Sequence, residues 1–165
     1  MNRESLSALL KANSNIEWNE RRFNSNEDAT FWTPIFVYES SAGTVHRIGL
    51  TDSGVWSAEY ADNLHITNPE NYFAFVTILE MQRGVFLTAL KTGLFVLSLP
   101  EKIISTFPFD EVMLAAMKHG GHWGQLAEQW LESGYPLSPQ IIIEFPNHVF
   151  VRKEQKRRMV LITKA

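Results

Sequence analysis

The sequence contains no cysteine among its 165 residues. Disulfide bridges and thiolate-ligated metal sites are therefore excluded. It also lacks an uninterrupted apolar run of the roughly 18–20 residues that a transmembrane helix requires, because Glu80 and Lys91 interrupt its most apolar part. Residues 1–15 show no sustained apolar stretch, so they are not typical of a signal peptide. We therefore expect a cytoplasmic protein that does not bind a membrane.

Positive charge is missing from the middle of the chain. Between Ile48 and Gln82 there is no lysine or arginine, while five carboxylates are present: Asp52, Glu59, Asp62, Glu70 and Glu80. The balance reverses over residues 152–164, where six lysine and arginine residues accompany a single acid, Glu154. The net charge is −3 and the isoelectric point is near 5.9, so we expect no nucleic-acid partner. The acidic stretch is either a solvated face or a surface that attracts a basic partner.

The overall composition is that of a globular protein. Hydrophobic residues make up 45% of the sequence and charged residues 20%, which is typical of a chain that buries a core. No internal repeat, low-complexity segment or long Pro/Gly/Ser-rich linker divides it. We therefore predict a single globular domain over residues 1–165.

The N-terminal part of the chain predicts a short helix followed by a meander of strands. Apolar residues with helical spacing predict a helix over Ser5–Lys11, and the polar stretch Asn19–Thr30 is predicted to be a loop. β-Branched and aromatic residues between glycine-containing turns then predict three strands, near Ile35–Glu39, Thr44–Leu50 and Val55–Tyr60. Pro34 indicates that the first of these strands lies at a sheet edge or begins there.

The segment after the meander is predicted to begin as a central helix. Asn68 is a suitable N-cap, and Pro69 fits the first helical position. Apolar side chains then occupy all sides, as in a buried helix. We predict this helix to about Leu90, with Gly93 as its stop, and then a strand over Leu94–Leu99. A hairpin in the second half of the segment stays open as an alternative.

The stretch MKHGGHWGQLAEQWLESGYP, from Met117 to Pro136, belongs to a predicted helical hairpin near residues 109–133. Both helices show apolar residues at i, i+3, i+4 and i+7, and Gly120 and Gly134 suit the positive φ angle that follows a helix end. A short helical segment between Pro100 and Pro108 precedes the hairpin. A short helix from Ser138 and a strand hairpin over residues 148–164 are predicted to follow it.

Together these elements predict an α+β fold. The sheet is expected to be largely antiparallel and to consist of the N-terminal meander and the C-terminal hairpin. The helices, including the helical hairpin, are expected to pack on one face of the sheet.

His119 and His122 are the most conspicuous candidates for a reactive site. A zinc site needs three or four ligands on rigid elements, whereas two glycines separate these histidines. An oxyanion loop of the His-Gly-Gly kind requires a GxSxG nucleophile elbow, which the sequence lacks. A DNA-reading helix would present Glu128 and Glu132 to phosphates. We therefore expect a packed corner with no metal or cofactor.

The second helix of the hairpin resembles a pattern in bacterial immunity proteins of polymorphic-toxin and contact-dependent growth inhibition systems. The positions that carry the resemblance are Trp123, Ala127, Trp130, Leu131, Gly134, Tyr135 and Pro136. The resemblance implies a small protein that binds and blocks the toxin domain of its own system, with no catalysis of its own. Toxins in such systems are often nucleases with basic surfaces, which an acidic patch would complement.

These observations favour a non-catalytic binding protein that neutralises a cognate toxin or effector domain with a basic surface. The predicted partner-binding residues are Asp52, Trp56, Glu59 and Asp62. Trp56 is the candidate aromatic anchor, although it also fits a core position of the meander. The alternative is a small enzyme or small-ligand-binding domain whose site is assembled from residues distant in sequence, including His46 or His65. A structural or chaperone-like subunit is a third possibility.

Overall fold

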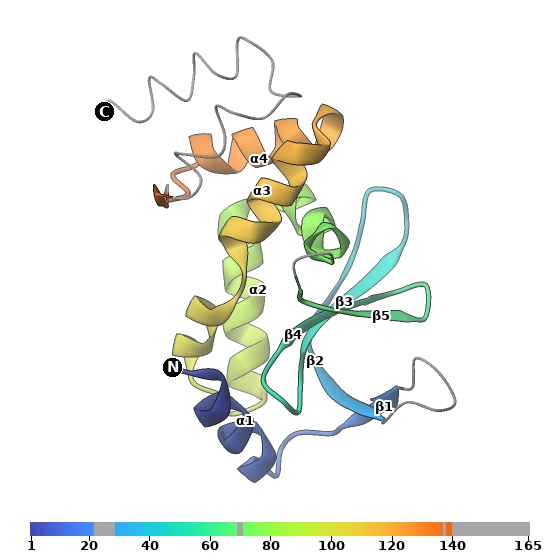
Figure 1. Cartoon of the computed structure of the whole chain (residues 1–165), viewed down its shortest axis with the longest axis vertical. Coiled ribbons are helices and arrows are strands. Elements are labelled where there is room, and N and C mark those ends of the chain that lie inside the picture. The colour runs from blue at the N-terminus through green and yellow to red at the C-terminus, as the bar shows by residue number, and fades with distance from the viewer. Residues whose placement is uncertain (22–28, 69–70, 137, 140–165) are drawn as a thin grey trace. The chain divides into compact units, whose positions relative to one another are not determined.

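The structure is a computed structural model that describes residues 1–21, 29–68, 71–136 and 138–139 (Figure 1). These residues form an antiparallel sheet and a set of helices, which confirms the predicted α+β class. The chain divides into two compact units. Unit 1 comprises residues 1–71 and 85–107, and unit 2 comprises residues 72–84 and 108–165.

Unit 1 contains a five-stranded sheet in the order β1-β2-β3-β4-β5, in which every neighbouring pair is antiparallel. The strands are β1 (Asn19–Arg21), β2 (Thr30–Glu39), β3 (Val45–Thr51), β4 (Trp56–Tyr60) and β5 (Asn63–Ile66). The helices are α1 (Arg3–Ala12), the 3₁₀ helix η2 (Glu101–Thr106) and α2 (Arg83–Val96), which begins in unit 2 with its first two residues. Connections along the meander are short, so sequential strands are also spatial neighbours.

The predicted elements of unit 1 are largely confirmed. Helix α1 covers the expected helix, β2, β3 and β4 cover the three expected strands, and η2 is the segment expected between the two prolines. The loop predicted over Asn19–Thr30 is wrong at both ends. Asn19–Arg21 forms β1 and pairs with Thr30–Trp32 at the start of β2, because backbone pairing with a neighbouring strand outweighs polar composition. Strand β5 was not predicted.

Pro34 lies within β2, which is an interior strand and not the predicted edge. Strand β1 pairs only with Thr30–Trp32 and therefore does not reach Pro34. The register between β2 and β3 also shifts between Pro34 and Phe36. A short neighbour and a bulge together accommodate a residue that has no backbone N–H to donate.

The segment after the meander differs from its prediction. The 3₁₀ helix η1 (Tyr72–Glu80) and helix α2 follow each other in the sequence as two separate elements. The strand predicted over Leu94–Leu99 is wrong, because α2 continues to Val96. Pro69 falls outside the described residues. No single helix among the described residues is long and apolar enough to span a membrane, and η1 and α2 reach that length only if the two are counted together.

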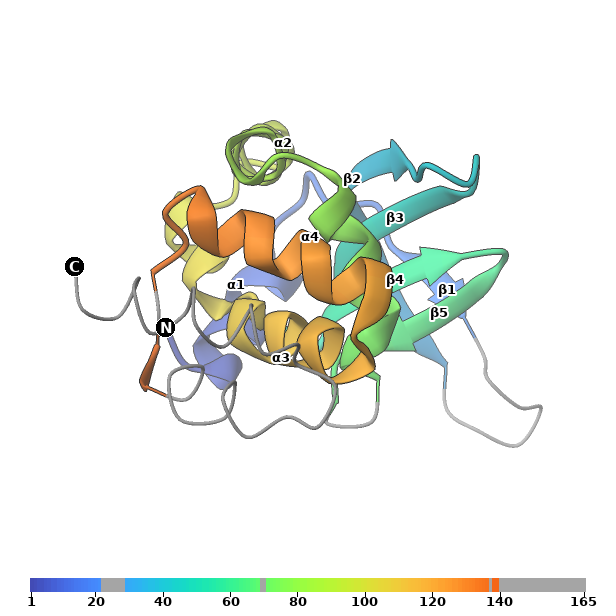
Figure 2. The same cartoon turned by 90° about the horizontal axis from the view of Figure 1, so that it is seen from above.

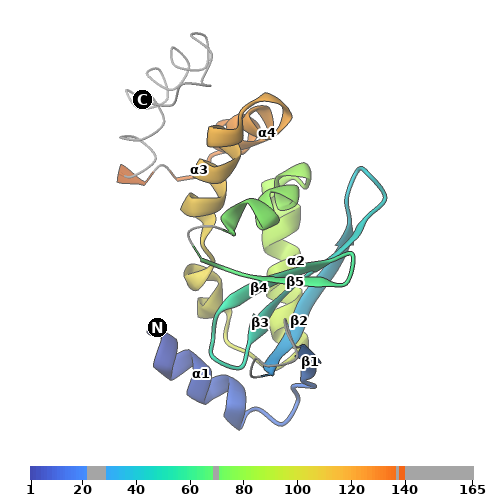
Figure 3. The ribbon, with the colours of Figure 1, turned by 45° about the vertical axis from the view of Figure 1, so that its right-hand side comes forward.

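Gly93 allows α2 to approach the sheet and does not end the helix. A Cβ atom at this position would lie 2.0 Å from the backbone oxygen of Ile35 in β2. Phe86, Leu90 and Leu94 form the buried face of α2, and the Phe86 ring meets Phe36 of β2 edge-on with centroids 5.4 Å apart. Figure 3 shows α2 running along the sheet. Gly93, which was predicted to end the helix, is therefore required for close packing, since only glycine leaves room for the neighbouring backbone.

Unit 2 is built around the predicted helical hairpin. It consists of α3 (Phe109–His119) and α4 (Gly121–Glu132), which pack against each other and against η1 (Figure 2). Gly120 connects the two helices with a φ angle of 69°, as expected for a glycine after a helix end. The indole N–H of Trp130 donates to the backbone oxygen of Met81 at 2.9 Å, which attaches α4 to the end of η1. The predicted C-terminal strand hairpin lies outside the described residues.

Candidate functional site

Asp52, the first predicted partner-binding residue, lies in the turn between β3 and β4. Its backbone N–H donates to Phe31 O at 2.8 Å, and its backbone oxygen accepts from Ser7 Oγ at 2.8 Å. Its carboxylate lies 3.7 Å from Lys11 Nζ, and the side chain is 33% exposed. Asp52 therefore joins α1 to the sheet, and a cation from its own chain already partly balances its charge.

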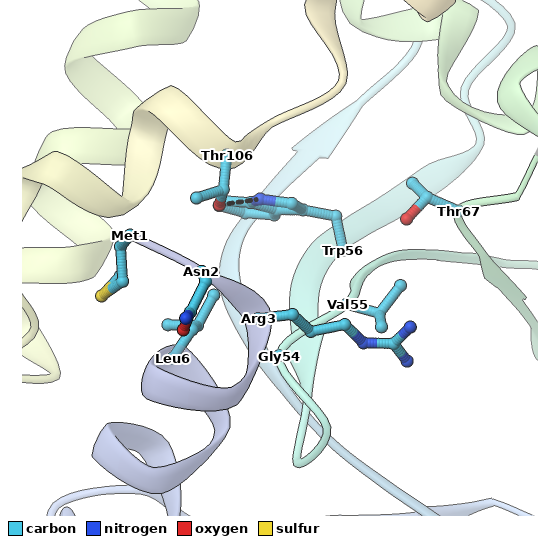
Figure 4. A pocket seen from close by; sticks show the side chains of 9 residues that line it. All are labelled: Met1, Asn2, Arg3, Leu6, Gly54, Val55, Trp56, Thr67 and Thr106. Atoms are coloured by element: carbon cyan, nitrogen blue, oxygen red, sulfur yellow. Dashed lines mark hydrogen bonds between the residues drawn. The ribbon is translucent and has the colours of Figure 1, made fainter.

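Trp56 lies at the start of β4 and is 2% exposed. Its indole N–H donates to Thr106 Oγ1 at 3.0 Å (Figure 4). Its ring meets Phe107 edge-on with centroids 5.0 Å apart. The Trp56 side chain is thus a core element that attaches η2 to the sheet. It presents almost no surface to a partner.

Glu59 is a buried carboxylate, only 1% exposed. It lies directly opposite Arg47 in the β3–β4 register. Its Oε2 is 2.9 Å from Arg47 Nη1, and its Oε1 is 2.6 Å from Arg21 Nη2. Two guanidinium groups therefore balance this charge inside unit 1, as a buried carboxylate requires.

Asp62 is the most open of the four residues. It is exposed in the turn between β4 and β5, and its φ angle is 62°, a conformation that aspartate adopts more readily than most residues. The four residues therefore do not form one exposed acidic face in the structure. Their role in partner binding stays a prediction.

A cavity of about 240 Å³ lies beside Trp56 (Figure 4). Its lining comes from the start of α1, the β3–β4 turn, the chain after β5 and η2, with residues Met1, Asn2, Arg3, Leu6, Gly54, Val55, Trp56, Thr67 and Thr106. Arg3 is the charged side chain of this lining, and its Nε–H donates to Ser53 O at 3.3 Å. The lining contains no carboxylate or histidine, so general acid–base chemistry has no candidate here.

The histidines of the meander belong to a row of rings across the sheet. Tyr38, His46, Tyr60 and His65 come from β2, β3, β4 and β5, with successive ring centroids 5.2, 5.2 and 4.7 Å apart. Nε2 of His65 is buried and has no hydrogen-bond partner in the part of the chain that the structure describes. Burial lowers the pKa of His65, because the imidazolium loses solvation. The row is a packing feature in which the neutral imidazole of His65 is favoured.

His119 and His122 lie at the junction of α3 and α4, and both are exposed. Nε2 of His122 is 4.0 Å from Glu80 Oε1. Within residues 1–21, 29–68, 71–136 and 138–139, no group of three or more His, Asp or Glu side chains is arranged to hold a metal ion. The junction instead exposes aromatic surface that the sequence did not reveal.

We call this surface the aromatic corner and define it as Phe73, His119, His122 and Trp123. Phe73 is 41% exposed, and its ring stacks on His119 with centroids 4.6 Å apart and an interplanar angle of 24°. The Trp123 ring stands at 87° to Phe73, with centroids 6.2 Å apart. The His122 ring meets Trp123 edge-on at 5.0 Å. Sequence reasoning placed Phe73 in a helix buried on all sides and therefore missed it.

A polar cluster connects the beginning of the α3–α4 hairpin to the chain that follows it. The Tyr135 hydroxyl donates to Asp110 Oδ1, and the Arg83 guanidinium lies 5.8 Å from the Tyr135 ring centroid. Arg83 Nη1 also donates to Gly134 O at 2.9 Å. Burial, followed by the hydrogen bond and charge of Asp110, raises the pKa of Tyr135. This cluster connects the start of α2, the start of α3 and the chain after α4.

The outer side of α2 is a further exposed apolar surface. Phe95 is 81% exposed, Val96 69% and Val85 54%. Thr88 and Thr92 are exposed at the intervening helical positions, so the five side chains share one helix face. We call these five residues the α2 outer face. The sequence prediction missed it because it assigned residues 94–99 to a strand, where Phe95 and Val96 would point to opposite sides.

The chain was compared with known protein families, curated proteins and solved structures, and nothing matches it in any of the three comparisons.

Proposed function

We propose that the chain is a non-catalytic binding protein that neutralises a cognate toxin or effector domain by protein–protein contact, as immunity proteins do. The α2 outer face is the main support, because Phe95 exposes 81% of its surface on a helix whose opposite side is buried. Contiguous exposed apolar surface of this kind marks contact sites, and buried aromatic side chains carry much of the affinity in protein interfaces.

The proposed partner presents an apolar surface to α2. The five side chains of the α2 outer face carry no charge, and the neighbouring Lys91 is paired with Glu101 at 2.7 Å. A charged partner surface would lose solvation against this face without gaining an ion pair. An apolar patch on the effector domain, with charged residues at its rim, is the complementary surface.

The test is a protection and binding experiment with the toxin or effector domain whose gene neighbours that of this chain. Cells that express this domain should grow when the wild-type chain is co-expressed, and the two proteins should co-purify in a 1:1 ratio. The variant Phe95→Asp should lose protection, because it would bury an unpaired carboxylate in the interface. Val37→Asp is the matched control, since Val37 is 56% exposed on β2, away from the α2 outer face.

Two results would contradict different parts of this proposal. A wild-type chain that neither binds nor protects would overturn the proposed function. A Phe95→Asp variant that protects as well as the wild type would overturn only the assignment of the α2 outer face. If the face instead binds a second copy of the chain, light scattering should show a dimer that Phe95→Asp converts to a monomer.

The cavity beside Trp56 is the observation that favours the alternative of a small-ligand-binding domain. Its volume of about 240 Å³ and its single charged side chain, Arg3, suit a small anion with an apolar body. Substitution of Arg3 by Gln should then weaken binding of the ligand, while protection from a toxin should remain unchanged.

A further inference from the structure

We infer that the aromatic corner of unit 2 is a binding site for an arginine side chain of a partner protein. This inference rests on the proposed function, because it identifies a second surface through which the effector domain is recognised. It concerns the helical hairpin and is independent of the α2 outer face. Its support is the geometry of the aromatic rings and a nearby carboxylate.

Two aromatic rings of the corner stand nearly perpendicular to each other. Phe73 and Trp123 make an interplanar angle of 87°, and Phe73 is 41% exposed. An aromatic ring attracts a cation to its negative π-face. His119 already stacks on Phe73, so the exposed part of the Phe73 ring is the surface that remains for a cation. A planar guanidinium suits such an arrangement better than an ammonium group, because it stacks on aromatic faces and is less strongly hydrated.

A carboxylate lies beside His122, the histidine whose ring contacts Trp123. Oε1 of Glu80 is 4.0 Å from Nε2 of His122, whose ring contacts Trp123 edge-on at 5.0 Å. The Glu80 side chain is 15% exposed, so water screens it less than a fully exposed acid. A guanidinium over Phe73 or Trp123 would be attracted by this carboxylate, and guanidinium–carboxylate pairs are the strongest of the side-chain ion pairs.

The experiment is an NMR titration of the full chain with a defined peptide. The probe is an N-acetylated, C-amidated hexapeptide of alternating arginine and glycine. The control peptide replaces each arginine by citrulline, which keeps the shape of the side chain and removes its charge. The indole N–H signal of Trp123, assigned with Trp123→Phe, should shift in a saturable manner with the arginine peptide and not with the citrulline peptide.

Two variants and their matched controls locate the site. Phe73→Ala and Glu80→Gln should each weaken peptide binding at least fivefold, which corresponds to about 1 kcal/mol. Phe31→Ala removes a phenylalanine of unit 1 that is 40% exposed, and Glu17→Gln removes an exposed carboxylate of unit 1. Both controls should bind within twofold of the wild type. Thermal unfolding of all four variants checks that each is folded.

Several outcomes would overturn the inference. These are an absence of saturable shifts, equal binding of the citrulline peptide, or wild-type affinity in both Phe73→Ala and Glu80→Gln. If the effector domain nevertheless binds and protects in cells, the proposed function stands and only the arginine site is wrong. If the peptide binds as expected but no effector domain does, the corner recognises arginine and the proposed function is wrong.

Discussion

Glu59 and Glu80 belong to the same acidic stretch of the sequence but have opposite environments. Glu59 in unit 1 is 1% exposed and is held by Arg47 and Arg21. Glu80 in unit 2 is partly exposed and lies near His122 at the edge of an aromatic surface. In the sheet, Arg21 and Arg47 reach the carboxylate of Glu59 from other strands, because residues distant in sequence become direct neighbours across strands. A run of acidic residues therefore does not by itself define an acidic surface.

The same contrast applies to the aromatic residues. Trp56 in unit 1 is enclosed by η2, whereas Phe73 in unit 2 and Phe95 on α2 are open to solvent. Two of the four residues selected from the sequence for partner contact, Trp56 and Glu59, are buried. The helices that were interpreted as core elements expose aromatic surface. Residues that the sequence suggested as surface contacts thus lie in the interior beside the sheet, and helices that it suggested as core elements have exposed aromatic side chains.

The largest expected effect concerns the buried charge of unit 1. Replacing both Arg21 and Arg47 by Gln should lower the free energy of unfolding by about 3–5 kcal/mol, because it leaves Glu59 buried without a cation. Urea unfolding at pH 7 measures this change. Lys11→Gln is the control, since its exposed pair with Asp52 at 3.7 Å should contribute at most about 1 kcal/mol. Equal stability of the two variants would show that Glu59 needs no partner.

The second effect compares glycines in two helices. Gly93→Ala should destabilise by about 1–3 kcal/mol, because the new Cβ would overlap the backbone of β2. Gly124→Ala in α4 should stabilise by about 0.5–1 kcal/mol, because its Cβ would lie 3.9 Å from the nearest atom and alanine favours the helix. Thermal unfolding distinguishes the two. A stabilising Gly93→Ala would contradict the close contact between α2 and the sheet.

The third effect is a loss of stability at alkaline pH that depends on unit 2. The pKa of Tyr135 is raised in the folded state, first by burial and then by Asp110. The unfolded chain therefore loses this proton first, so the contribution of Tyr135 to stability is fully present below about pH 10 and is lost as the pH rises above it. Tyr135→Phe should have a shallower decline between pH 10 and 11. Parallel curves for both proteins would contradict this role.

The smallest expected effect is a loss of stability at acidic pH that depends on unit 1. Burial lowers the pKa of His65 in the folded state, so below about pH 6.5 the unfolded chain binds a proton that the folded chain excludes. The contribution of His65 is therefore fully present above that pH and decreases as the pH falls through the range below it. Substitution of His65 by Asn should flatten this part of the profile. His122→Asn, at an exposed position, serves as the control.

The sequence predicted much of the fold because local signals and tertiary structure agree there. Helix α1, the three strands of the meander, η2 and the hairpin of α3 and α4 all follow their apolar periodicity and turn residues. Strand β5 was missed because it has only four residues. The segment 94–99 was misassigned because a short apolar run fits a buried strand and a helix equally well. Packing against Ile35 decided in favour of the helix.

The candidate site was less predictable than the fold, for a physical reason. Residue types and their spacing show which side chains are able to carry charge or aromatic surface, but exposure depends on what covers them. Arg21 and Arg47 lie 38 and 12 residues from Glu59 in sequence, so no local pattern shows that they balance its charge. The Phe73–His119 contact likewise joins η1 to the end of α3.

The amino-acid sequence by itself determined the α+β class, the absence of disulfides and the two helices around Gly120, because composition, periodicity and glycine positions are local properties. Tertiary structure decided that Glu59 and Trp56 are buried, that Gly93 lies inside a helix, and that Phe73 and Phe95 face solvent. These outcomes depend on contacts between segments far apart in the chain, which set the burial of every side chain. The tertiary contacts therefore determine which side chains are able to contact a partner.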